Sequence, residues 1–140
     1  MGDYKQLKVW EKAHQLCLSV MHETERFPTD ERDGLAAQLR RSAISLASSI
    51  VEGSDRQSEG DMGRFLQIAR GSLWAVHYQL LVARDLGFLA AEQWSELSAR
   101  CDEIGRMLQG LLTHVRRQSR KGNGARDTQP ARRKAVRAGA

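Results

Sequence analysis

The sequence predicts an all-α protein, an antiparallel up-down bundle of four helices. Four successive segments carry apolar residues at three- and four-residue steps, the spacing that places them on one face of a helix. The chain has two prolines, and both fall outside these segments. The connections between segments are short, which makes consecutive helices antiparallel neighbours. No segment shows a competing strand pattern.

The first helix is expected to end before Pro28, because the residue preceding a proline is disfavoured in helical conformation. Its spacing predicts one buried face. The residues of that face are Trp10, Ala13, Cys17, Val20, Met21 and Thr24, with Phe27 continuing the series.

The second helix is expected to begin at an N-cap formed by Thr29, followed by acids that complement the helix dipole, and to end at Gly53. Its predicted core residues are Leu35, Leu39, Ala43, Leu46, Ala47 and Ile50.

The third helix is expected to start at Ser58, which with Asp61 resembles a capping box, and to end at Gly87. The fourth is expected to begin near Glu92. The predicted core residues are Phe65, Ala69, Ser72, Val76, Leu80 and Ala83 in the third helix, and Trp94, Leu97, Cys101, Ile104, Leu108, Leu111 and Val115 in the fourth.

Residues 1–117 are therefore assigned to the bundle, and residues 118–140 to a basic, disordered C-terminal tail. The net charge of +5 is unevenly distributed. From Arg116 onward there are nine basic residues and one acid, a net +8, whereas the preceding 115 residues hold 13 basic and 16 acidic groups, a net −3. The tail either binds polyanions without sequence preference or serves as a solubilising extension.

The third helix carries a second apolar stripe formed by Gly71, Trp74, Tyr78 and Leu81. Such a stripe either enlarges the core of a monomer, with Trp74 capping it, or forms an interface between subunits. Glycine inside a helix costs about 1 kcal/mol relative to alanine, so Gly71 indicates a close approach of another helix. We therefore assign this stripe to self-association.

Arginines on the second and third helices are candidates for phosphate contacts, because the guanidinium fork matches phosphate oxygens. The alternative is pairing with nearby acids, for instance a network of Arg41, Glu52 and Arg56 that leaves Arg40 and Arg64 free for RNA. The full set of predicted nucleic-acid contacts is Arg40, Arg41, Arg56, Arg64, Arg70, Arg116, Arg117, Arg120, Lys121, Arg132, Arg133 and Lys134.

No catalytic or metal-binding constellation is expected. His14 and Cys17 have a spacing that suits two metal ligands, but no further ligand accompanies them. Cys17 and Cys101 are expected to be buried free thiols of a reducing compartment. The N-terminus lacks the apolar run of a signal peptide, and no window approaches the about 18 apolar residues of a membrane span, so we expect a cytoplasmic protein without a cofactor.

The order and spacing of several short motifs resemble the family of four-helix bundles encoded by intervening sequences of bacterial 23S ribosomal RNA genes, the S23 type. The resemblance covers about residues 4 to 116. Its strongest motifs are Leu7-x-Val9-Trp10-x-x-Ala13, Phe27-Pro28-x-x-Glu31, Gly34-Leu35-x-x-Gln38-x-Arg40-Arg41, Ser45, Ile50-Val51-Glu52-Gly53-x-x-Arg56 and Arg64-Phe65-Leu66-x-x-Ala69-x-Gly71-Ser72-Leu73.

The chain departs from the family pattern at four positions. Ser49 stands in place of the usual Asn and Val51 in place of Ala, and Ala75 and His77 replace acids after the Gly-Ser-Leu. The resemblance implies an antiparallel bundle that assembles as a barrel-like homopentamer. The chain is also similar to the accessory protein of diversity-generating retroelements, a basic bundle that binds reverse transcriptase and nucleic acid.

The sequence thus favours a non-enzymatic, oligomeric bundle that binds nucleic acid, RNA before DNA, through basic surfaces and tail. One alternative is a protein-binding adaptor, such as a partner of a retroelement reverse transcriptase. The other is a structural bundle whose tail only aids solubility.

Overall fold

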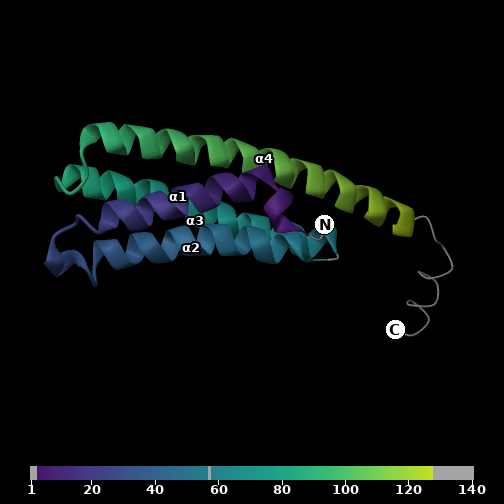
Figure 1. The fold of residues 1–140 in the computed structure, drawn as a ribbon. Helices are drawn as coiled ribbons and strands as arrows, with labels where there is room; N and C mark the ends of the chain where they lie inside the picture. Colours follow the sequence, from purple (N-terminus) through teal and green to yellow (C-terminus); the bar gives the residue numbers. More distant parts are fainter. Residues whose placement is uncertain (1–2, 57, 128–140) are drawn as a thin grey trace, which may run out of the picture.

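The computed structural model describes residues 3–56 and 58–127, and there the chain forms four long helices and no strand. These are α1 (Lys8–Thr24), α2 (Leu35–Ser54), α3 (Glu59–Asp85) and α4 (Ala91–Asp127); short 3-10 turns, η1 (Tyr4–Gln6) and η2 (Thr29–Glu31), precede α1 and α2. Consecutive helices run in opposite directions (Figure 1). The predicted all-α fold with four helices is confirmed. No described helix combines the length and the hydropathy needed to cross a membrane.

The helices enclose one apolar core to which all four contribute. Leu16, Leu39, Leu73 and Leu108, one from each helix, are completely buried in it. α2 and α3 share the most extensive contact, and α1 and α4 the least extensive among neighbouring helices. Burial of such side chains contributes about 1.5–3 kcal/mol each, so this core dominates the stability of the bundle.

The buried face of α1 matches the prediction in part. The predicted residues Ala13, Val20, Thr24 and Phe27 are buried, whereas Met21 is half-buried. Val9 and Leu16 are buried, whereas their neighbours Trp10 and Cys17, which the spacing favoured, are only half-buried. Trp10 instead stacks on His14, with ring centroids 5.0 Å apart. Because Val9 and Trp10, and likewise Leu16 and Cys17, are adjacent and apolar, the helical period allows either member of each pair to face the core. Packing against the other helices decides which one is buried.

The start of α2 also differs from the prediction. Thr29 does not cap α2; it begins the 3-10 turn η2, and α2 starts at Leu35. Gly34 occupies the N-cap position and has no side chain to offer, so a carboxylate oxygen of Glu31 accepts the hydrogen bond of the Leu35 N–H at 3.3 Å. An acid from the preceding turn thus replaces the usual hydroxyl cap.

Both predicted ends of α3 are supported by capping bonds. The Ser58 hydroxyl accepts the Asp61 N–H at 3.0 Å. At the other end Gly87 has a φ of +79°, the left-handed conformation that ends many helices. There the Phe88 N–H donates to the Ala83 carbonyl at 2.9 Å and the Gly87 N–H to the Arg84 carbonyl at 3.0 Å, the bonding pattern of a Schellman motif.

The core residues of the last three helices largely match the prediction, with shifts of one position. In α3, Ser72 is half-buried and its hydroxyl lies 2.8 Å from that of Ser45 in α2, while the adjacent Leu73 fills the core. In α4, Leu112 is fully buried instead of Leu111. In α2, Leu35 and Ala47 are half-buried, at the margin of the core.

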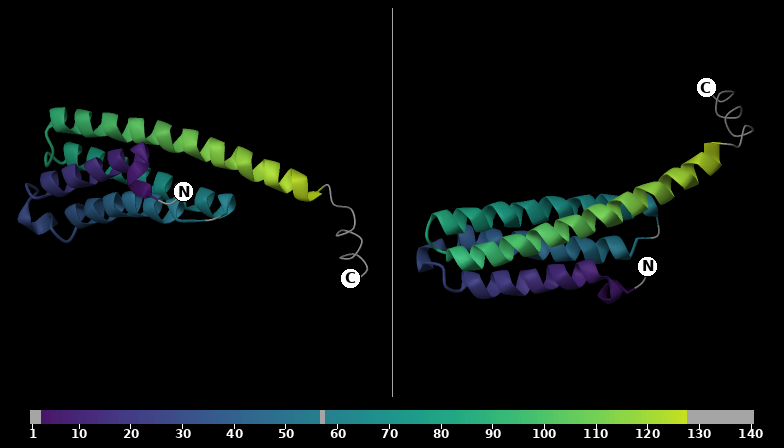
Figure 2. Two further views of the ribbon diagram at one scale, coloured as in Figure 1. Left: turned by 45° about the vertical axis from the view of Figure 1, so that its right-hand side comes forward. Right: turned by 90° about the horizontal axis from the view of Figure 1, so that it is seen from above.

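α4 continues well past the end of the bundle that was expected at residue 117. It runs to Asp127, so residues 118–127 are helical rather than disordered. No proline interrupts this stretch, and its arginines, lysine and glutamine are good helix formers, although Gly122 and Gly124 are poor ones. The last part of α4 extends beyond the ends of the other helices (Figure 2). The remainder of the predicted tail, 128–140, lies outside the described residues.

The two cysteines are free thiols, as expected, but they differ in burial: Cys101 is buried and Cys17 half-buried. Burial raises the pKa of both, and for Cys101 desolvation, together with the nearby Asp102 carboxylate, raises the pKa to about 12 from the usual 9.0. The Cys101 thiol therefore stays protonated in the folded protein at pH values where it ionises in the unfolded chain.

We predict that Cys101 lowers the stability of the protein in alkali. Between pH 9 and 12 the folded state retains a proton that the unfolded state loses, so the free energy of unfolding falls as pH rises. One such group contributes up to about 1.4 kcal/mol per pH unit. Denaturant unfolding from pH 8 to 11 should give a steeper decline for the natural protein than for Cys101→Ala; parallel curves would contradict this assignment.

Candidate nucleic-acid interface

Two arginines rest on one phenylalanine where α2 ends and α3 begins. The guanidinium carbon of Arg56 lies 4.5 Å from the centroid of the Phe65 ring, and that of Arg64 lies 4.9 Å from it. Cation–π contacts of this kind contribute about 0.5–1 kcal/mol at exposed sites. Both guanidiniums are thereby held against the same ring, although they come from different segments.

Phe65 can lie there because α2 has no side chain at Gly53. A Cβ at that position would be only 3.1 Å from the Cβ of Phe65 and 3.6 Å from the carbonyl oxygen of Met62. Gly53 therefore permits this close approach, since a side chain there would make Phe65 shift by a few tenths of an ångström; the sequence did not reveal this role. The expected stop at Gly53 is displaced by one residue, since α2 ends at Ser54.

The basic part of α4 lies at the same end of the bundle. A Cβ on Gly63 would lie 3.6 Å from Val115, which places the start of α3 beside the α4 segment that contains the next arginines. The basic residues of this segment are exposed: Arg116, Arg117, Arg120 and Lys121. The end of α2 and the start of α3 lie at the right-hand end of the bundle in Figure 1, and α4 passes this end and continues beyond it. We call the cluster of Arg56, Arg64, Arg116, Arg117, Arg120 and Lys121 the basic end.

Acidic side chains are interspersed there but do not form ion pairs with these arginines. Glu52, Asp55, Glu59 and Asp61 are all exposed, and among the side chains described for residues 3–56 and 58–122 no salt bridge joins them to a basic group. The proposed network of Arg41 with Glu52 and Arg56 does not form. Arg41 and Glu52 are about three helical turns apart on α2, and Arg56 is held by Phe65.

The other predicted contacts are dispersed. Arg40 was expected to be free to contact RNA, but its Nε donates a hydrogen bond to the Thr24 hydroxyl at 2.8 Å. Arg41 is exposed on α2, and Arg70 is half-buried on α3. The predicted contacts at 132–134 (Arg132, Arg133 and Lys134) lie outside the described residues.

The apolar stripe on α3 is exposed. Trp74 and Tyr78 are 42% and 64% exposed, Gly71 is exposed and Leu81 is half-buried. A Cβ on Gly71 would meet nothing within 4 Å, so no helix of the same chain approaches it. Ile68, 44% exposed, is a further large apolar residue of α3 that the sequence reasoning missed. It lies three residues before Gly71, a helical spacing that could have included it in the predicted stripe.

One trio of side chains has the residue types of a hydrolytic triad but not its arrangement. His77 Nε2 lies 3.1 Å from the Ser98 hydroxyl and 3.9 Å from a carboxylate oxygen of Asp102. In a triad the serine and the acid contact opposite ring nitrogens of the histidine, whereas here both face Nε2. In the part of the chain that the structure describes, no three potential ligands gather around a metal site.

The family model of the 23S rRNA-intervening sequence proteins matches residues 5–110 of this chain. None of the curated proteins matches it. A crystal structure of a protein of unknown function from the S23 ribosomal protein family of Bacteroides thetaiotaomicron VPI-5482 is similar, with a TM-score of 0.70 and 20% identity over 75% of this chain and 95% of that chain. At this identity the likeness shows the fold alone. Because the family model spans most of the chain, including α1 to α3 and much of α4, the protein belongs to the 23S rRNA-intervening sequence protein family.

Proposed function

We propose that this protein is a non-enzymatic, self-associating helical bundle that binds RNA through its basic end. The observation that carries the proposal is that basic side chains from three segments lie at one end of the bundle, and none of them forms a salt bridge with a described carboxylate. These residues are Arg56, Arg64, Arg116, Arg117, Arg120 and Lys121. A surface that gathers guanidiniums and leaves them without carboxylate partners is suited to phosphate.

The geometry of the basic end suits a folded RNA better than a particular base sequence. Its two best-fixed guanidiniums lie on one ring, and a basic helix extends from the bundle beside them (Figure 2). Such an arrangement offers charge along a nucleic-acid backbone but few groups able to read base edges. Double-stranded and structured RNA are recognised largely by shape and backbone contacts.

Self-association completes the proposal. The exposed apolar residues of α3 favour contact with a second copy, and the resemblance to the family favours a pentamer. Several basic ends in one assembly would bind the same RNA with greater avidity than one. The two free cysteines are in keeping with a cytoplasmic location.

We predict that the double substitution Arg56→Gln and Arg64→Gln weakens binding of a hairpin RNA and lowers its salt dependence. Loss of two phosphate contacts should reduce the slope of log affinity against log salt concentration by about 1.4 to 1.8. The matched control removes two exposed charges elsewhere, Arg26→Gln with Arg106→Gln. Filter binding across a salt series should show a larger loss of RNA affinity for the first double variant than for the control. Equal losses of affinity would indicate attraction by net charge alone.

We predict that Trp74→Ala shifts the assembly toward monomers. A large aromatic at an interface contributes about 2 kcal/mol or more, which corresponds to a more than tenfold weaker association. Leu18→Ala is the control, because Leu18 is similarly exposed, at 49%, but lies on α1. Sedimentation velocity measures the outcome. A natural protein that sediments as a monomer, or an unchanged assembly after Trp74→Ala, would exclude this interface.

A further inference from the structure

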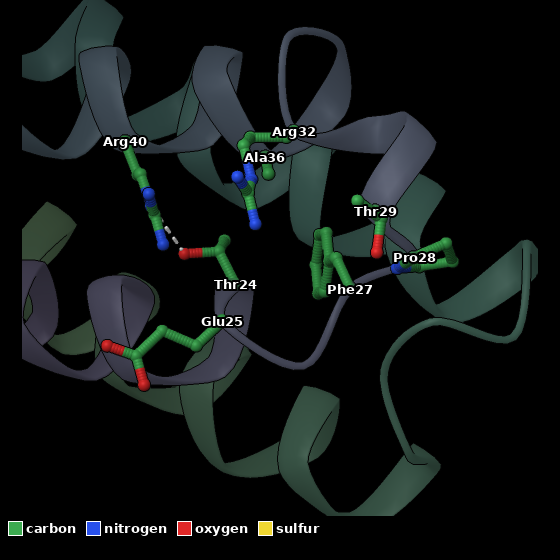
Figure 3. A pocket seen from close by; sticks show the side chains of 8 residues that line it. All are labelled: Thr24, Glu25, Phe27, Pro28, Thr29, Arg32, Ala36 and Arg40. Carbon is green, nitrogen blue, oxygen red and sulfur yellow. Dashed lines mark hydrogen bonds between the residues drawn. The ribbon is translucent and has the colours of Figure 1, made fainter.

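A cavity of about 460 Å³ lies where the chain passes from α1 to α2. Residues from the last turn of α1, the connection and the first turns of α2 line it (Figure 3). It is at the opposite end of the molecule from the basic end (Figure 1). Its size falls within the about 300–1,000 Å³ that is typical of small-molecule sites.

One wall of the cavity is a guanidinium held in a fixed position. Arg40 Nε donates to the hydroxyl oxygen of Thr24 at 2.8 Å, and this hydroxyl in turn donates to the Val20 carbonyl at 2.7 Å. Thr24 is only 4% exposed, so its side chain cannot reorient freely. The hydrogen bond at Nε leaves both terminal nitrogens of Arg40 available, and no described residue accepts a hydrogen bond from them.

A second guanidinium, that of Arg32, projects into the same cavity from the turn before α2 (Figure 3). No described carboxylate forms a salt bridge with Arg32 or Arg40. The nearby Glu31 carboxylate accepts the hydrogen bond that caps α2, and Glu25, which also lines the cavity, directs its carboxylate away from Arg32 (Figure 3). Two positive groups therefore face the cavity without a paired anion from the described chain.

We propose that this cavity binds a phosphorylated small molecule of about nucleotide size, with the phosphate between Arg32 and Arg40. A phosphate monoester carries close to two negative charges near pH 7, which match the two positive charges of two guanidiniums. A carboxylate carries one negative charge, and a single guanidinium can pair with both of its oxygens. The Phe27 ring and Pro28 line the cavity beside the arginines and offer apolar contact to the organic part of the ligand. The Thr29 hydroxyl, which also lines the cavity, offers it a polar contact.

The test is calorimetric titration of the full-length protein with AMP and with adenosine, which lacks the phosphate. AMP should bind and adenosine should not. Arg32→Gln and Arg40→Gln should each weaken AMP binding by about tenfold or more, since each removes charged hydrogen bonds to phosphate. Arg32→Gln is the safer variant for folding, because its side chain is exposed and makes no hydrogen bond within the described residues.

Arg26→Gln is the matched control, because Arg26 lies in the same connection, is exposed and does not line the cavity. It should bind AMP like the natural protein. Absence of AMP binding at millimolar concentration, equal binding of adenosine, or AMP affinity that survives both cavity substitutions would each overturn the proposal.

Discussion

Near the end of α2, at Gly53, no α2 side chain lies between the helix backbone and Phe65 of α3. Gly53 leaves room for the Cβ of Phe65, which would otherwise lie 3.1 Å from a methyl group in α2. Because Phe65 fits there, its ring is nearly buried, at 9% exposure, yet still reaches the arginines on either side of the connection between the helices. The position of Arg56 and Arg64 within the basic end depends on this close approach.

The packing explains how a chain with a mildly acidic body presents a basic surface. Charges are mixed along α2 and α3, but the antiparallel order brings the end of α2, the start of α3 and the cationic part of α4 to one end. There the acids remain in solvent, and two of the arginines have an aromatic ring as their neighbour in place of a carboxylate. In the proposed assembly, contact through the exposed face of α3 would bring several such ends together.

Much of this fold could be predicted from local patterns. The caps at Ser58 and Gly87 depend on residues within one turn of each other, and the core faces of α2 to α4 follow from helical spacing. The face of α1 was predicted only in part, because Val9 and Trp10 are adjacent and both apolar. The start of α2 was missed because a 3-10 turn and an acid at position 31 perform the capping.

The candidate sites were less predictable, because they depend on contacts between segments. The arginines of the basic end could be named, but their support on Phe65 and their freedom from acids follow from tertiary packing. Arg40 was expected at an RNA surface, yet its bond to Thr24 places it in the cavity between α1 and α2. The position of Arg32 at this cavity could not be predicted from the sequence, since a single exposed arginine in a turn is common.

The most direct test of the proposed RNA surface is hydrogen–deuterium exchange of the full-length protein with and without a hairpin RNA. We expect slower exchange on RNA binding in the first turns of α3, around residues 59–66, and in α4 around residues 116–122. Exchange at the start of α2, residues 35–41, should not change. Protection centred on the start of α2 or on the exposed face of α3, with none at the basic end, would contradict it.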